Sequence, residues 1–415
     1  MVITAGKAYL IFTAIILVAY AIRHCIFSGN RLLRPSRHGL QEVFDSLPPS
    51  ISVIIPMHNE QRVADHILQA LLQCDYPVDR MEIIAIDDHS TDATLETIRY
   101  YATLDPRIRA ITRENGKRGK PAALQEAVAM ARGDILAVFD ADYIPGSGLL
   151  RQIVAPFADP GVGAVMARVV PLNCGFNLLT RLLDLERAAG YQVDQQARHN
   201  MRLLPQYGGT AGAFRKSAYH AVGGFDVNIL AEDTELTFRL RLNGWRVVYA
   251  NRAECYEEVP QTWPVRIRQI RRWAIGHTQC FIRFAWKMLR ARGIHPLERL
   301  DCIMLLGIYL VGPLLAIALI DSFFLFFCGC LSVVNTFLVT FAIMAFNAIG
   351  NFASFFQIGT AVLLDGSGDR ARLLPLNVLN FAISIVVVTE ALTTHAVLRI
   401  FGRRTIWHKT DRFRA

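Results

Sequence analysis

Two acidic residues at the end of an apolar run have the type and spacing of a metal site. Asp140 and Asp142 follow "ILAVF" and are separated by one residue. Carboxylates in this arrangement can share a hard divalent cation, because Mg²⁺ takes one or two carboxylates and completes its octahedron with water and phosphate oxygens. The alternative is a solvated turn that binds nothing. The apolar run favours the metal site, because it places both acids at the tip of a strand.

A second acidic pair, Glu232 and Asp233, opens the segment "EDTELTFRLRL", whose apolar residues have helical spacing. A carboxylate at a helix start is stabilised by the free backbone N–H groups there, so the pair could simply cap the helix. One of the two could instead be a general base that accepts a proton from an incoming hydroxyl group, across a pocket from the metal. Taken alone, the segment favours the cap.

A basic and aromatic segment, residues 263–299, carries the third candidate site. Gln269, Arg272 and Trp273 stand at positions i, i+3 and i+4, on one face of a helix. The indole can pack on the C–H groups of a sugar, and the guanidinium offers forked donors to phosphate. The segment contains nine Arg or Lys residues and a single acid, Glu298, so it also has the composition of a helix on an anionic membrane surface. We expect both uses.

The elements that must position these residues alternate between strand and helix. This alternation predicts βαβ units and a mostly parallel sheet flanked by helices, that is, an α/β fold. Ligands of such sheets bind beyond the carboxyl ends of the strands, so Asp87, Asp88, Asp140 and Asp142 are expected at one edge. The predicted strands are 52–60, 81–90, 108–112 and 134–143, and the predicted helices are 62–76, 91–104 and 120–131.

The distribution of apolar residues predicts an integral membrane protein with one large aqueous domain. The chain has 415 residues, 53% of them hydrophobic, and a formal charge of +9. Residues 8–22, 302–364 and 376–398 are almost uniformly apolar, and a membrane-spanning helix needs ~20 such residues. The stretch between them, 30–300, has the composition of a soluble domain. The eight cysteines show no paired CxxC motif and no Cys/His metal spacing, so we expect reduced, structural thiols.

Flanking charges predict how the chain is oriented. The first apolar run could be a cleavable signal peptide, but basic residues follow it, which favours an anchor. By the positive-inside rule, residues 30–300 and the basic tail 401–415 are then cytoplasmic, which requires an even number of crossings after residue 300. Only three apolar stretches are evident. Either 302–364 contains three crossings, or the tail is an exception, or one stretch lies in the interface.

Several residues inside the apolar stretches are unusual there. Pro313, Gly350 and Asn351 are candidate helix breaks, because irregular backbone is tolerated at membrane depth where protein or water covers it. Asp321 and Glu390 are the acids of these stretches. Intramembrane acids often line a substrate path, although both could equally lie at the membrane edges.

With these residues assembled, the chain resembles the membrane-embedded family-2 glycosyltransferases, which include cellulose, chitin, hyaluronan and poly-N-acetylglucosamine synthases. The resemblance covers about residues 50–280 and implies a GT-A-like, mixed, mostly parallel sheet together with transmembrane helices. It rests on seven short motifs in order: "IPMHNE", "IDDHSTDAT", "GKPAAL", "DAD", "GGTAGAFRKSA", "AED" and "QIRRW". The expected organisation is an anchor (1–29), a cytoplasmic transferase domain (30–262), interfacial helices (263–300), a transmembrane region of three or four spans (301–400) and a basic tail (401–415).

The resemblance also implies roles for individual residues. Asp140 and Asp142 would hold the donor diphosphate through Mg²⁺ or Mn²⁺. Asp233 would be the catalytic base for direct, inverting attack on the anomeric carbon. The implied nucleotide-binding residues are His58, Asn59, Glu60, Asp87, Asp88, Lys120 and Asp140. The residues implied to hold the diphosphate and the acceptor are Glu232, Gln269, Arg272 and Trp273.

The implied activity is transfer of a sugar from a cytoplasmic, UDP-linked donor to a growing polysaccharide or oligosaccharide at the inner (plasma) membrane. A single transfer to a lipid acceptor is the alternative, and a transporter or scaffold with an inactive transferase domain is a third hypothesis. Ala231 stands where many synthases have threonine, and "GGTAGAF" lacks the cysteine of several polymer synthases, which leaves product and processivity open. The QxxRW signature favours repeated addition. Expected partners are donor, acceptor, membrane lipids and export proteins. Nucleic acid is not expected, because the basic residues cluster beside membrane segments.

Overall fold

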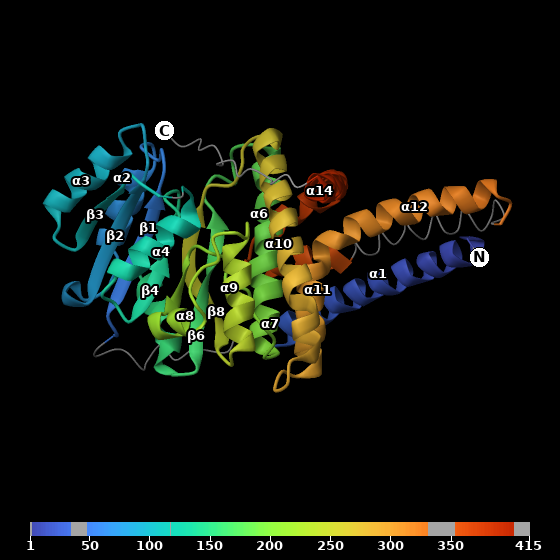
Figure 1. The fold of residues 1–415 in the computed structure, drawn as a ribbon, viewed down its shortest axis with the longest axis horizontal. Coiled ribbons are helices and arrows are strands. Elements are labelled where there is room, and N and C mark those ends of the chain that lie inside the picture. Colours follow the sequence, from blue (N-terminus) through green and yellow to red (C-terminus); the bar gives the residue numbers. More distant parts are fainter. Residues whose placement is uncertain (1, 35–47, 117, 331–352, 402–415) are drawn as a thin grey trace.

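The computed structural model describes residues 2–34, 48–116, 118–330 and 353–401. Gly350, Asn351 and residues 402–415 of the basic tail lie outside the described residues. Figure 1 shows an α/β body from which two long helices, α1 (Val2–Leu33) and α12 (Val311–Phe327), extend together on one side.

One half of the sheet is parallel and was predicted strand by strand. In the order β3-β2-β1-β4, neighbouring strands pair in parallel. Strands β1 and β2 are buried over nearly their whole length, as expected for apolar, β-branched runs covered on both faces. Met57 at the end of β1 is in register with Asp87, so the carboxyl ends of these strands meet at one edge. The bounds are β1 Ile51–Met57, β2 Met81–Asp88, β3 Ile108–Arg113 and β4 Ile135–Val138.

The other half is mixed and extends the sheet to eight strands in the order β3-β2-β1-β4-β7-β6-β8-β5. Strand β7 is antiparallel to both β4 and β6, whereas β6 and β8 are parallel to each other. The expected mixed, mostly parallel α/β fold is therefore confirmed. The bounds are β5 Ile144–Pro145, β6 Val162–Pro171, β7 Gly212–Arg215 and β8 Arg246–Glu257.

Helices cover the sheet and carry the remaining candidate residues. The predicted helices appear as α2 and α3, which pack on each other, and α4, which packs on β1 and β2. On the other side of the body, α6 runs into the π-helix η4 and then α7, and α9 lies against the long helix α10 (Figure 1). The bounds are α2 Ala64–Leu72, α3 Thr94–Leu104, α4 Lys120–Met130, α6 Leu178–Ala188, η4 Ala189–Gln195, α7 Gln196–Asn200, α9 Glu232–Leu242 and α10 Trp263–Arg290.

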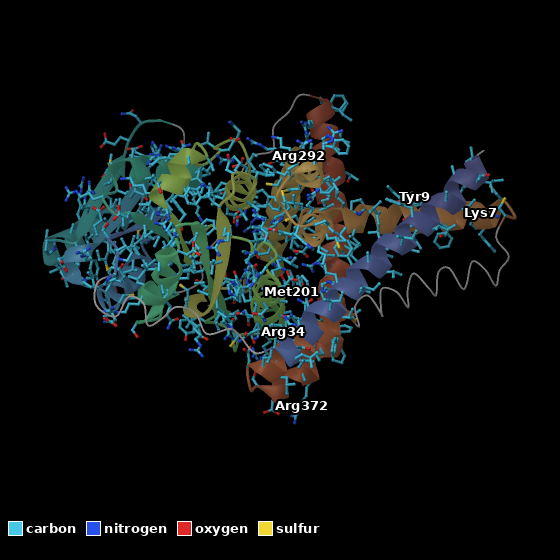
Figure 2. The ribbon with its side chains drawn as sticks, turned by 90° about the horizontal axis from the view of Figure 1, so that it is seen from below. Lys7, Tyr9, Arg34, Met201, Arg292 and Arg372 are labelled. Atoms are coloured by element: carbon cyan, nitrogen blue, oxygen red, sulfur yellow. The ribbon has the colours of Figure 1, made fainter. Side chains whose placement is uncertain are left out.

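Three helices among the described residues are long and apolar enough to cross a membrane: Val2–Leu33, Pro296–Phe327 and Gly368–Ile400. The second includes α11 (Pro296–Gly307) and α12, and the third includes α14 (Asn377–Ile400). Helices α1 and α12 lie side by side, and the Tyr9 hydroxyl donates to the carbonyl of Leu314 (2.9 Å). Helix α14 runs across them. It is seen end-on in Figure 1 and crosses the direction of α1 and α12 in Figure 2, where Tyr9 marks the outer part of α1.

The two acids of the apolar stretches both face neighbouring helices. Asp321 of α12 lies against α1, where a Cβ atom added to Gly6 would be 2.6 Å from its carboxylate oxygen. Glu390 of α14 pairs with Arg271 of α10 (2.8 Å). This ion pair attaches α14 to the helix that carries the QxxRW residues. A role of either acid in a substrate path stays a prediction.

Candidate active site

Lys120 connects acids that come from two distant parts of the chain. It begins α4, and its Nζ lies 2.6 Å from Asp140 Oδ1 and donates to the carbonyl of Gly209 (2.9 Å). Burial alone would lower the pKa of Lys120, but the nearby carboxylates of Asp140, Glu232 and Asp233 raise it above its ordinary value. The side chain is therefore a charged ammonium at neutral pH, between the acids that follow β4 and those that begin α9.

Asp88 holds the loop that presents Lys120. The backbone N–H of Gly119 donates to Asp88 Oδ2 (2.7 Å), and Arg113 Nη1 lies 2.5 Å from Asp88 Oδ1. Arg113 ends β3 in register with Asp88, so the parallel pairing of the strands brings the two together. Both carboxylate oxygens of Asp88 are thus engaged by protein groups. Its position fits a supporting role for this loop, and direct nucleotide contact stays a prediction.

Its neighbour Asp87, unlike Asp88, has a carboxylate oxygen that is still able to accept a hydrogen bond from a ligand. Asp87 is only 2% exposed, and its Oδ2 accepts a long hydrogen bond from the Ser90 N–H (3.3 Å). Its Oδ1 is buried and has no hydrogen-bond partner among the described residues. Buried carboxylate oxygens are normally paired, so an unpaired one at the edge of the sheet suits a ligand donor such as the N–H of a nucleotide base.

The residues after β1 brace the neighbouring loop. The His58 ring donates from Nδ1 to the carbonyl of Asp88 (2.7 Å). The N–H groups of Asn59 and Glu60 donate to hydroxyl groups of segment 90–94, at 2.9 and 2.8 Å. These contacts fix the two loops at the carboxyl edge of β1 and β2, where the sequence placed the nucleotide.

Asp233 lies in the first turn of α9, against the backbone of Gly209. A Cβ atom at Gly209 would be 3.0 Å from both Cβ and Oδ2 of Asp233, and φ at Gly209 is +73°. Glycine is required here for the close approach and for the left-handed backbone. Asp233 Oδ1 accepts from the Thr234 N–H (2.6 Å), and the N-cap residue of α9 is Ala231, which forms no side-chain cap. The N-cap residue is thus Ala231 and neither of the two acids, so the capping role that the sequence alone favoured does not fully account for the acid pair.

We call Asp140, Asp142, Glu232 and Asp233 the acid cluster. Among these four residues, Glu232 holds a proton near neutrality. Burial is the largest effect and raises its pKa to about 7, with the Asp233 charge acting in the same direction. The charges of Lys120 and Arg272 oppose the rise. Arg272 of α10 consequently lies close enough to the α9 acids to affect the pKa of Glu232, as Lys120 does.

We expect the raised pKa of Glu232 to make folding stability depend on pH. Between pH 4.5 and about 7 the folded chain keeps a proton on Glu232 that the unfolded chain releases, so this contribution is present below pH 4.5 and is lost as pH rises through 7. The loss is at most about 3 kcal/mol. In Glu232→Gln it is absent, so the Tm of this variant relative to wild type should increase across that range. Thermal melts of detergent-solubilised protein test this.

The matched control for that experiment is Glu96→Gln, at an exposed position of α3. Its melting curve should follow the wild-type pH dependence. A Tm difference between Glu232→Gln and wild type that stays constant from pH 4.5 to pH 8 would contradict the assignment.

The predicted metal ligands flank a tight turn after β4. Asp142 is 4% exposed, whereas Asp140 is partly exposed and its backbone N–H donates to Thr210 Oγ1 (2.9 Å). Two carboxylates fit a hard cation that takes its other ligands from phosphate and water. Within the described residues no group of three or more His, Cys, Asp or Glu side chains could hold a metal ion alone. The site therefore suits a cation that binds together with a phosphate ligand.

The QxxRW residues lie on α10, as predicted, within a cluster of arginines. The indole of Trp273 lies between the guanidinium groups of Arg187 and Arg266, at 5.2 and 5.3 Å from the ring centroid. Gln269 Oε1 accepts from Arg266 Nη1 (2.8 Å), and Arg266 pairs with Glu186 of α6 (2.6 Å). Gln269 thus orients Arg266, and Trp273 is held firmly in place.

Gly276 sets the distance between α10 and the α9 acids. A Cβ atom there would be 2.8 Å from the Ala231 Cβ and 2.9 Å from the Ala231 N. Gly276→Ala should therefore displace the start of α9, with Glu232 and Asp233, by a fraction of an ångström or more. Because a misplacement of ~1 Å can cost about 10²-fold in rate, we expect kcat to fall by about that factor. Gly29→Ala, with no heavy atom within 4 Å of the added Cβ, is the control and should keep wild-type activity. Equal kcat values would contradict the prediction.

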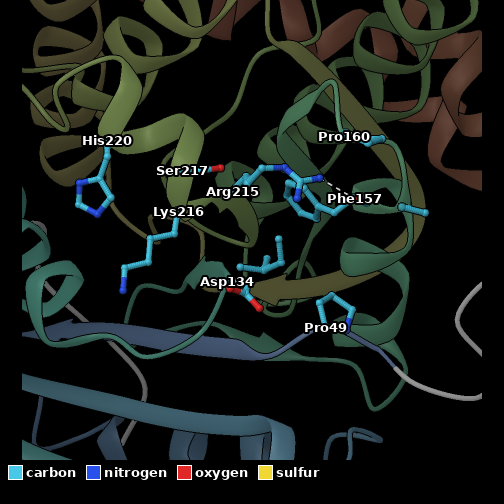
Figure 3. Close-up of a pocket in the computed structure, with 10 residues that line it drawn as sticks. Pro49, Asp134, Phe157, Pro160, Arg215, Lys216, Ser217 and His220 are labelled. Carbon is cyan, nitrogen blue, oxygen red and sulfur yellow. Dashed lines mark hydrogen bonds between the residues drawn. The ribbon is translucent and has the colours of Figure 1, made fainter.

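A hollow of about 700 Å³ opens on the body at a place away from these acids (Figure 3). It includes Asp134, which precedes β4 and so lies at the opposite end of that strand from Asp140. Its basic residues already bind backbone: Lys216 Nζ donates to the Ala131 carbonyl (2.6 Å) and Arg215 Nη2 to the Phe157 carbonyl (2.7 Å). The hollow shares no residue with the acid cluster, and we assign the site to the carboxyl edge of the strands.

Several residues of the site were not singled out by the sequence. Arg113 follows a predicted strand at the edge where Asp88 lies, so the rule that parallel strands end together could have identified it. Gly209 and Thr210 belong to the quoted motif "GGTAGAF", but nothing in the motif shows that they contact Asp233 and Asp140. Arg187, which flanks Trp273, carries no sequence signal that we recognise.

The fold and this acid cluster define a class of enzyme, and comparison with known proteins identifies it. Residues 48–276 match the family described as Glycosyltransferase like family 2. The chain belongs to glycosyltransferase family 2 and is a glycosyltransferase. The similarity to processive synthases within this family stays a prediction.

Two relatives show how far the similarity extends. The probable glycosyltransferase YdaM of Bacillus subtilis (strain 168) is 29% identical over 382 residues, covering 88% of this chain and 87% of that protein. The beta-monoglucosyldiacylglycerol synthase of Synechocystis sp. (strain ATCC 27184 / PCC 6803 / Kazusa) is 31% identical over 65% of this chain, and the matched region is 56% of its own length.

A third relative and a solved structure complete the comparison. The probable glucomannan 4-beta-mannosyltransferase 7 of Oryza sativa subsp. japonica is 30% identical over 65% of this chain and 47% of its own length. The chain thus spans about half of this relative and of the Synechocystis synthase. The mannosyltransferase PcManGT from Pyrobaculum calidifontis, in complex with GDP-Man and Mn²⁺, has a TM-score of 0.57 at 23% identity, covering 87% of this chain and 98% of that one. This likeness supports the GT-A-like fold.

Proposed function

We propose that the chain transfers a hexosyl group from a cytoplasmic nucleotide sugar to a hydroxyl group of an acceptor at the membrane, with inversion at the anomeric carbon. The observation that carries the proposal is the position of Lys120. It contacts Asp140 on the side expected for the donor diphosphate, and it lies within electrostatic range of Glu232 and Asp233 on the side expected for the acceptor. The leaving group and the base would then meet at one place.

On the donor side, Asp87 and the loop of His58, Asn59 and Glu60 bind the nucleoside. Asp140 and Asp142 hold Mg²⁺ or Mn²⁺, which when bound neutralises the charge that develops on the departing diphosphate. Lys120 and Arg272 stabilise the same charge from the protein side. Asp88 keeps the loop of Lys120 in position through the Gly119 N–H.

On the acceptor side, Asp233 removes the proton from the attacking hydroxyl group. The oxygen attacks the anomeric carbon, the bond to the diphosphate breaks, and the proton stays on the Asp233 carboxylate. Trp273, which packs on two arginines and stays partly exposed, would contact the terminal sugar of the acceptor. A single displacement of this kind inverts the configuration and gives a β-linked product from an α-linked donor.

The donor we propose is a UDP-linked hexose or N-acetylhexosamine, and the acceptor is a growing polysaccharide or oligosaccharide. Relatives named for glucosyl and mannosyl transfer support a hexose, and the QxxRW face of α10 supports a sugar acceptor. A lipid acceptor with a single transfer is the second candidate. It is favoured by a cavity with buried polar groups beside the apolar helices, described below.

We place the transferase domain in the cytoplasm at the inner (plasma) membrane. The three long apolar helices support membrane attachment, and the basic residues that follow α1 support this orientation. Because α14 crosses the direction of α1 and α12, we propose that it lies along the membrane surface when they span (Figure 2). Donor, acceptor and membrane lipids are the partners, and export proteins would act on a polymeric product.

The test is an incubation of the full chain, in lipid nanodiscs with Mn²⁺, with a panel of radiolabelled nucleotide sugars. We expect that one donor transfers its label to a product that is either a glycolipid or a polymer. A ladder of lengths supports the polysaccharide acceptor, and one discrete glycolipid supports the lipid acceptor. UDP binding without label transfer from any donor would refute the proposed activity and favour the inactive scaffold.

A further inference from the structure

A cavity of about 240 Å³, lined by both polar and apolar side chains, lies where the long apolar helices meet the transferase body. Its walls come from α1, α6, the π-helix η4, α7, α11, the apolar helix Ala353–Leu364 and α14, together with Ile308. None of the carboxylates assigned above to the donor or to catalysis is among the residues that line it. π-helical turns inside helices are frequently found at functional sites. The cavity is therefore a second site, distinct from the acid cluster.

The strongest sign of a ligand is Asn377, in the first turn of α14. This residue is 0% exposed, and neither its Oδ1 nor its Nδ2 has a hydrogen-bond partner among the described residues. One turn further, Asn380 is 1% exposed and donates from Nδ2 to Glu186 (3.1 Å), while its Oδ1 has no partner in the same described part of the chain. Buried carboxamides are normally satisfied, so these groups call for a polar ligand or water.

The charges around the cavity are balanced within the protein. Arg23 of α1 lies 3.0 Å from Asp194 and 2.7 Å from Asp301. Arg198 of α7 pairs with the same two acids, at 2.8 and 3.0 Å. Each arginine is thus already paired twice, so within the described lining neither of the two is left to neutralise a phosphate. The ligand that fits is uncharged and carries hydroxyl groups.

The remaining lining includes the polar residues Tyr20, His24, Ser354 and Gln357 and a larger set of apolar side chains. Met304, Leu305, Ile308, Ile358 and Phe381 contribute side chains to the wall. Three of the walls, α1, α11 and α14, belong to helices long and apolar enough to span a membrane. Figures 1 and 2 show these helices crossing beside the body. A cavity with such walls suits an amphiphile whose tails remain in the bilayer.

The cavity is also connected to the proposed acceptor face. Glu186 lines the cavity and pairs with Arg266 (2.6 Å), and the Arg266 guanidinium packs on the Trp273 ring. The ion pair between Glu186 and Arg266 therefore connects the cavity with Trp273, the residue proposed to contact the acceptor sugar.

We propose that this cavity binds the uncharged, hydroxyl-bearing headgroup of a membrane lipid of the diacylglycerol class, with Asn377 as its main hydrogen-bonding partner. The acyl chains would extend from the cavity toward the bilayer along the apolar helices that line it. The lipid is the acceptor, or the membrane anchor of the acceptor, and in this respect the inference rests on the proposed function.

The test measures saturable binding of radiolabelled dioleoylglycerol to the full chain in detergent micelles. Asn377→Leu removes the hydrogen-bonding groups, and Gly190→Phe fills the cavity from η4, where an added Cβ meets no heavy atom within 4 Å. Both should weaken binding at least about ten-fold, the loss expected for one or two hydrogen bonds. Val378→Leu, an exposed neighbour on α14, and Gly29→Ala, whose added Cβ meets no heavy atom within 4 Å, are the controls and should bind within two-fold of wild type.

Three results would overturn the proposal. Wild-type binding in both Asn377→Leu and Gly190→Phe would place the lipid elsewhere. Tighter binding of a polyprenyl phosphate, lost in the same two variants, would refute the uncharged headgroup. Absence of saturable binding to the wild-type chain would leave only water in the cavity. Titration of the same samples with UDP and Mn²⁺ reports on the acid cluster separately, so a failure there counts against the proposed function and not against the lipid site.

Discussion

Asp233→Asn is expected to abolish sugar transfer while nucleotide binding stays close to wild type. The carboxamide has the same shape and can still accept the Thr234 N–H through Oδ1, so the start of α9 should not move. Lys120 also keeps its contact with Asp140. What is lost is the capacity to take a proton from the acceptor hydroxyl group. General base catalysis is worth about 10²–10⁴-fold in rate, and we expect kcat to fall by that amount.

The measurement compares kcat for transfer with the Kd for UDP and Mn²⁺ on the same preparation. Asp79→Asn, at an exposed acid of the same domain, is the control and should leave both values unchanged. Turnover near wild type in Asp233→Asn would show that the base is another group. A large loss of UDP binding would instead assign Asp233 a role in holding the donor.

The second large effect is expected from Asp142→Ala, which should remove most of the metal-dependent part of UDP binding. Asp142 is buried beside the partly exposed Asp140, and the pair supplies the carboxylate ligands of the proposed cation. Loss of groups that only orient metal ligands already costs 10–100-fold in affinity, so removal of a ligand should cost at least about 100-fold. Titration of UDP with and without Mn²⁺ measures this.

A volume-matched variant separates charge from packing in that experiment. Asp142→Asn keeps the shape of the buried side chain but weakens its interaction with a cation, so it should reproduce most of the loss. If UDP binding by both variants shows the same Mn²⁺ dependence as wild type, the carboxylates after β4 are not the metal ligands.

The parallel half of the fold could be predicted because its signals are local. Strands β1 to β4 and helices α2 to α4 lie where apolar periodicity placed them, and α9 begins at the predicted acid pair. The mixed half could not be placed in the same way. Strand β5 has two residues and β7 has four, too short for a periodic pattern, and β8 pairs with β6 across some eighty residues of sequence. Such pairings depend on tertiary packing more than on local propensity.

The site, like the fold, has one part that the sequence predicts and another part that it does not. The rule that ligands lie beyond the carboxyl ends of parallel strands placed Asp87, Asp88, Asp140 and Asp142 at one edge, whereas the roles of Lys120 and the α9 acids there were implied only by the resemblance. The partner of each side chain was not readable. Asp88 is engaged by Arg113 and Gly119, which depends on the register of β2 and β3. Gln269 binds Arg266, its neighbour on the same helix, and the cavity at Asn377 requires elements from four distant parts of the chain.

The account depends most on one claim: that acids from β2, β4 and α9 surround a single binding site for a nucleotide diphosphate and a cation. Anomalous diffraction at the manganese absorption edge, from crystals of the full chain grown with UDP and Mn²⁺, tests it directly. We predict one strong manganese peak bound by Asp140 or Asp142. The diphosphate of UDP should lie beside Lys120, and its uracil ring should lie beside Asp87. A manganese peak and a nucleotide bound away from these residues, for example in the hollow of Figure 3, would contradict it.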